Sequence, residues 1–121
     1  MDKKIITENG NNIAVIYNSE PLITDTQSAL DLIVSLYYND GCSRIVLNRE
    51  TLAENFFILS SGMAGEVLQK FSNYHAKIAI VGDFSQYTSK SLKDFMYECN
   101  NGNTAFFVEN EEAAVDRLSK V

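Results

Sequence analysis

Four polar residues follow apolar runs of the kind that form buried strands, and their side chains could carry chemistry. They are Asn48 and Glu50 after residues 45–47, and Asp83 and Ser85 after residues 78–81. At the carboxyl ends of parallel strands such residues can line a ligand crevice, where two carboxylates suit acid–base work or a cation. The plainer interpretation is that Asp83 accepts backbone N–H groups in a turn and that Glu50 is solvated. With no histidine or third acid beside them, we expect no metal and no cofactor.

A run of small residues, Ser60-Ser61-Gly62, precedes an amphipathic segment that we expect to be a helix. Free backbone N–H groups at a helix start can hold an anion, so Ser61 is a candidate for phosphorylation or phosphate binding. The alternative is that Ser61 is a simple N-cap. The run lacks the glycine pattern of a phosphate loop or a dinucleotide site. We interpret Gly65, inside the expected helix, as a place where the helix approaches the sheet closely.

The longest polar stretch runs from residue 83 to residue 91 and contains two aromatic residues, Phe84 and Tyr87. Lys90 and Lys93 lie at its end. Aromatic rings interleaved with cations can stack on a base or another ring, so if the protein binds a ligand, this stretch is the first candidate for its site. The alternative is that Phe84 and Tyr87 cover the edge of the sheet.

The chain has one histidine and two cysteines, which give no nucleophile–base–orienter set. We expect His75 to end a helix and Cys99 to face the core, and we assign no catalytic residue. The spacing of Cys42 and Cys99 matches neither a CxxC motif nor a zinc knuckle, so both thiols are expected to be reduced.

An alternation of short strands and helices must position these residues. Asn9-Gly10 between two β-rich runs predicts a hairpin, because both residues tolerate positive φ. Residues 50–61 are expected to pack as a short turn of helix or a covering loop. The expected strands are 4–7, 13–17, 44–47, 77–81 and 105–108. Four helices are expected. The first begins at a capping box of Thr24 with Gln27, and the second covers 63–74. The third begins at Ser91 with Asp94, and the fourth begins at Asn110. The pattern is ββαβαβαβα, a mostly parallel α/β sheet with an antiparallel N-terminal hairpin strand.

Length and charge limit the partners. The 121 residues suit one domain, 1–121, and 45% of them are hydrophobic. Ten basic and sixteen acidic side chains give a net charge of -6, which disfavours nucleic acid and anionic membranes. No secretory signal or membrane-spanning run is recognisable, so a cytoplasmic location is expected.

Two resemblances add to this. The blocks at residues 64–74 and 77–85 resemble the bacterial family catalogued as domain of unknown function 4180, which implies a small cytosolic domain without an assigned activity. The architecture looks like the STAS domain of anti-sigma-factor antagonists, in which a strand end and an Asp-Ser-Ser-Gly helix start form a phosphoswitch. By that resemblance Ser61 is the phosphorylatable residue, although Leu59 and Asn48 stand where that family has acidic residues.

The sequence therefore favours a non-enzymatic regulatory module that binds a protein partner, with a homodimer through the hairpin edge or a helix face as one form. The alternative is a small-molecule or anion-binding protein, or less readily an enzyme, with its site at the strand ends.

Overall fold

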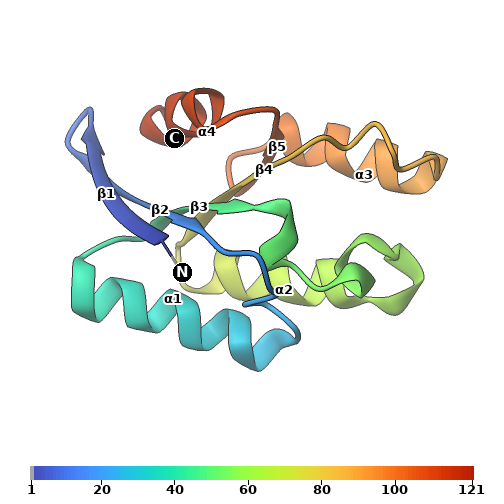
Figure 1. Ribbon diagram of the computed structural model, residues 1–121, viewed down its shortest axis with the longest axis horizontal. Coiled ribbons are helices and arrows are strands. Elements are labelled where there is room, and N and C mark those ends of the chain that lie inside the picture. Colours follow the sequence, from blue (N-terminus) through green and yellow to red (C-terminus); the bar gives the residue numbers. More distant parts are fainter. Residues whose placement is uncertain (1) are drawn as a thin grey trace.

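The strands lie in the sheet in the order in which they occur in the chain. β1 (Asp2–Glu8) pairs antiparallel with β2 (Asn11–Tyr17), and β3 (Arg44–Asn48), β4 (Lys77–Val81) and β5 (Ala105–Val108) continue the sheet in parallel. The computed structural model describes residues 2–121 (Figure 1). Asn9 and Gly10 form the hairpin turn with φ of 52° and 77°, so the hairpin prediction is confirmed.

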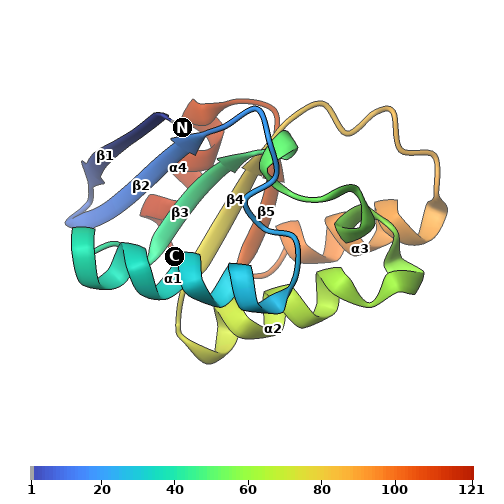
Figure 2. The ribbon, with the colours of Figure 1, turned by 60° about the horizontal axis from the view of Figure 1, so that its bottom comes forward.

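Three helices connect the parallel strands, and a fourth follows the last strand. They are α1 (Thr26–Asp40), α2 (Met63–Asn73), α3 (Lys90–Asn100) and α4 (Glu111–Ser119). Because right-handed crossovers step in one direction along the sheet, α1, α2 and α3 all lie on one face, and α4 packs on the other (Figure 2). The expected ββαβαβαβα class is confirmed. No helix within residues 2–121 is long and apolar enough to span a membrane.

Both faces of the parallel strands are buried, which explains their continuous apolar runs. Alternate residues such as Ile16 and Ile80 pack under α1–α3. Val15, Val46 and Phe106 face α4 instead. The sheet therefore separates two hydrophobic clusters, and its ends are the places where polar side chains can gather.

Two of the expected helix caps are wrong by one or two residues. Asp25, not Thr24, caps α1. Its carboxylate accepts from the N–H of Ser28, and the Ser28 hydroxyl accepts from the N–H of Asp25. Ser89, not Ser91, caps α3. The Asn110 cap on α4 is confirmed by its bond from the Ala113 N–H at 2.8 Å.

Candidate functional site

Asn48, at the end of β3, joins two chain segments. Its Oδ1 accepts from the Asn18 N–H at 3.0 Å, and its Nδ2 donates to the Asn18 carbonyl at 2.8 Å and to Glu50 Oε1 at 3.0 Å. The bond from Asn48 is the largest cause that lowers the pKa of Glu50 below its usual value of 4.5. Asn48 therefore fixes the exit of β2, and Glu50 is an exposed carboxylate held beside it.

Asp83 and Ser85 form a turn after β4. The Asp83 Oδ1 accepts from the Ser85 hydroxyl at 2.6 Å and from the Ser85 N–H at 3.0 Å. These two bonds lower the pKa of Asp83. The arrangement matches the plainer interpretation of a turn carboxylate, since its acceptor oxygen is engaged with the local chain.

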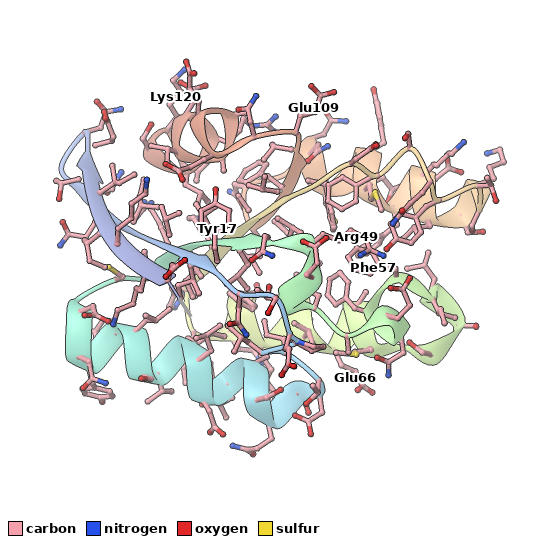
Figure 3. The ribbon with its side chains drawn as sticks, viewed as in Figure 1. Tyr17, Arg49, Phe57, Glu66, Glu109 and Lys120 are labelled. Atoms are coloured by element: carbon pink, nitrogen blue, oxygen red, sulfur yellow. The ribbon has the colours of Figure 1, made fainter. Side chains whose placement is uncertain are left out.

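Arg49 is the residue that organises this end of the sheet. Its Nη2 forms an ion pair with Glu54 Oε2 at 2.9 Å. Its Cζ lies 5.4 Å from the centre of the Phe57 ring (Figure 3). The same atom lies 5.2 Å from the centre of the Tyr87 ring, and both distances are within cation–π range. When the Gln86 side-chain amide has its oxygen toward Arg49, that oxygen accepts from Nε and Nη2, each at 2.9 Å.

Aromatic rings from two segments that are distant in the chain pack together beside Arg49. Phe57 belongs to the 3₁₀ segment, which we define as residues 49–61, and Phe84 and Tyr87 to the β4–α3 loop, residues 82–89. Phe57 and Tyr87 stack with ring centres 4.9 Å apart, and Phe84 meets Phe107 of β5 edge to face at 5.4 Å. The 3₁₀ segment is thus a covering loop, as expected, and the rings of Phe84 and Tyr87 pack on its Phe57 ring.

Gly82 is where these two segments touch. A Cβ placed on Gly82 would lie 2.9 Å from the Arg49 Cβ, closer than side chains pack. Gly65 differs, because a Cβ there meets nothing within 4 Å and the residue is exposed. The interpretation of Gly65 as a close-approach glycine is therefore wrong, and Gly82 holds that role.

Ser60, Ser61 and Gly62 lie in the turn before α2 and are exposed. Gly62 occupies the N-cap position with φ of 78° and has no capping side chain, so Ser61 is not the N-cap. The Ser61 hydroxyl donates to the Asn55 carbonyl at 2.6 Å and accepts from the Met63 N–H at 3.2 Å. These two bonds stay within the turn and do not reach Asn48 or Asp83.

The other reactive groups lie apart from the strand ends. Cys42 is buried and Cys99 half-buried, both as free thiols. Burial raises the pKa of Cys99 to about 11, which keeps it a protonated thiol at neutral pH. His75 follows α2 at φ of 55° and is exposed.

One cavity has no counterpart in the sequence analysis. It lies between α1 and the end of α2, has a volume of about 490 Å³, and includes Tyr37, Tyr38, Tyr74 and His75 in its lining. The three tyrosines are exposed. Its walls come from helices distant in the chain, so no motif marks it. Arg49 likewise carries no motif, because its partners Gln86 and Tyr87 lie far along the chain.

The geometry defines a mixed α/β domain whose strand ends are covered by its own loops. The chain belongs to the family described as Domain of unknown function (DUF4180), whose profile matches residues 8–118. A search of curated proteins finds no match. Among solved structures, a Thermotoga maritima protein described as a candidate anti-sigma factor antagonist is similar at 13% identity and a TM-score of 0.47. That similarity covers 95% of this chain and 91% of that chain.

Proposed function

We propose that the protein is a non-enzymatic module that binds a protein partner through its strand-end surface. This surface consists of the exposed residues of the 3₁₀ segment and the β4–α3 loop. The observation that carries the proposal is that the usual ligand crevice of such a sheet is occupied by Arg49, Phe57, Phe84 and Tyr87. A small ligand needs an enclosed cavity, whereas a protein partner needs an ordered surface.

The surface has the composition of an interface. Ile58 is 52% exposed on it, and Glu54, Asn55 and Ser85 of the same two segments are exposed polar residues. An apolar anchor within a polar rim is typical of protein-binding patches. The contacts of Arg49 hold the two segments in place, which lowers the entropy that ordering them on binding would cost.

Ser61 gives this surface a means of regulation. Its N–H donates to the Ile58 carbonyl at 2.9 Å, so it is linked directly to the apolar anchor. A phosphoryl group on Ser61 would remove the hydroxyl donation to Asn55 and add about two negative charges before α2. We propose that this modification changes the affinity for the partner.

Binding measurements test the proposal in two stages. A partner is first cross-linked to the protein in extract of its source, identified by mass spectrometry and purified. Ile58→Asp should then weaken the Kd by about tenfold or more, since an anchor is replaced by a charge. Tyr97→Asp is the matched control, because Tyr97 is 65% exposed on α3. Equal losses in both variants, or none in Ile58→Asp, would overturn the proposal. Equal affinity of Ser61→Asp and Ser61→Ala would remove the phosphorylation switch.

The alternative, a small-molecule or anion site at Asn48, Glu50, Asp83, Ser85 and Tyr87, has its own test. Thermal unfolding is measured with ATP, Mg²⁺ and inorganic phosphate. We expect no change in Tm, because these side chains already bond other groups of the chain, either nearby in the sequence or in neighbouring segments. A rise in Tm that Asp83→Asn abolishes would favour the small-ligand function instead.

A further inference from the structure

The two edges of the sheet differ in how their outward backbone groups are covered. At the β5 edge, the side-chain amide of Asn100, at the end of α3, makes the hydrogen bonds that a neighbouring strand would make. Its Oδ1 accepts from the Phe107 N–H at 2.8 Å, and its Nδ2 donates to the Phe107 carbonyl at 3.3 Å. The outward backbone groups of Phe107 are therefore satisfied within the chain, and this edge is closed to another strand.

Among residues 2–121, nothing covers the β1 edge in this way. β1 is seven residues long, contains no proline, and pairs with β2 along its whole length without a bulge. Figures 1 and 2 show it at the rim of the sheet with no element beyond it. In a hairpin closed by a two-residue turn, the residues flanking the turn form a hydrogen-bonded pair. Lys3, Ile5 and Thr7 therefore direct their backbone N–H and C=O groups away from β2.

We propose that two copies of the chain pair antiparallel through β1, with Ile6 opposite Ile6 on the twofold axis. In this register Ile5 of one copy faces Thr7 of the other, so the outward backbone groups of both strands meet. Lys4 of each copy then lies opposite Glu8 of the other, twice per dimer. The inference rests on the edge and its charges and is independent of the proposed partner surface.

Charge selects this register over those centred on Ile5 or Lys4. Centring the pair on Ile5 would place Asp2 opposite Glu8, and centring it on Lys4 would place two lysines together, and like charges directly opposite are destabilising. The Ile6 register also places the second copy's Lys4 beside an acidic cavity of about 380 Å³. Ile6, Glu8, Glu111, Glu112, Val115 and Asp116 are among its lining residues.

Charge exchange on β1 tests the proposal, with mass and dissociation constant measured by analytical ultracentrifugation. The wild type should sediment at about 100 μM as twice its 13.6 kDa. Glu8→Lys and Lys4→Glu should each weaken the dimer about tenfold or more, because each opposes like charges twice. The double variant K4E/E8K should restore it, with circular dichroism confirming that every variant is folded.

Glu66→Lys is the control, since Glu66 is exposed on α2 outside β1 and the acidic cavity. It makes the same change in net charge and should leave the dimer intact. A monomeric wild type would overturn the proposal. So would a double variant no stronger than the single ones. A Glu8→Lys dimer tighter than wild type would instead indicate the Ile5 register and would equally overturn it.

Discussion

The guanidinium of Arg49 lies 5.2 Å from the centre of the Tyr87 ring, although the two residues are far apart in the chain. Arg49 follows β3 directly, and Tyr87 lies three residues before α3 in the β4–α3 loop. Desolvation by burial raises the pKa of the Tyr87 hydroxyl, and its bonds with Gln86 and Arg49 oppose that rise. One cation therefore holds together the end of a strand, the 3₁₀ segment and a loop.

Replacing this cation should loosen the strand-end surface. Arg49→Ala removes the Glu54 ion pair and the contacts with two rings, and we expect a loss of about 1–2 kcal/mol in unfolding free energy. Urea denaturation measures the loss, and amide exchange across residues 82–89 should become faster. Lys90→Ala, which removes an exposed pair with Asp94, should cost no more than about 0.5 kcal/mol. Equal effects of the two changes would contradict the role assigned to Arg49.

Two glycine substitutions should have opposite signs. Gly82→Ala places a methyl group 2.9 Å from the Arg49 Cβ, so the loop must shift and the protein should lose about 1–3 kcal/mol. Gly65→Ala enters open space within α2 and should stabilise by about 0.5–1 kcal/mol. Thermal unfolding of both variants compares them directly. A stabilised Gly82→Ala protein would show that the two segments are not in close contact.

The closed β5 edge depends on one amide. Asn100→Ala leaves the N–H and C=O of Phe107 without their partner and should cost about 1–3 kcal/mol. The Phe107 amide should also exchange faster with solvent. Asn101→Ala is the neighbouring control, since the Asn101 side chain is exposed and bonds only the Tyr97 carbonyl. An unchanged Phe107 exchange rate would mean that the Asn100 side chain does not protect this edge.

Stability should fall in acid partly through Glu111. The hydrogen bond from Lys4, and to a lesser degree that from Tyr17, lowers the pKa of Glu111 below its usual 4.5. A lowered folded-state pKa stabilises the protein above about pH 4.5, and this contribution is lost as the pH falls through the folded value. Glu111→Gln should therefore reduce the difference in unfolding free energy between pH 7 and pH 3. Glu112→Gln, an exposed change in the same turn, should keep the wild-type difference, and a matching reduction there would refute the assignment.

Local patterns account for most of the fold. Strands 77–81 and 105–108 were predicted with their observed bounds, because apolar runs of that length have one favourable placement in a parallel sheet. The caps at Asp25 and Ser89 were missed. Each lies within two residues of another good capping residue, and the loop that enters the helix decides between them.

The site was less accessible to sequence reasoning. Asp83 and Ser85 follow β4 as predicted, and Asn48 is the last residue of β3 rather than the residue after it, because strand ends follow from hydrophobic pattern to within a residue. What they bond is a matter of tertiary contact, as with Asn48 and the backbone of Asn18. Arg49 carried no periodic signal, since its role depends on Glu54 and Phe57 of its own segment together with Tyr87 of another loop.

The placement of α4 affects how the chain folds while it is being synthesised. The side chains of Val15, Val46 and Phe106 are covered on their face of the sheet by α4, which follows all five strands in the chain. A nascent chain emerging from the ribosome can pair its strands and pack α1, α2 and α3 while that face is still open. Proteolysis ahead of Glu111 would recreate this state, with a complete sheet that presents an apolar face to chaperones or to other nascent chains.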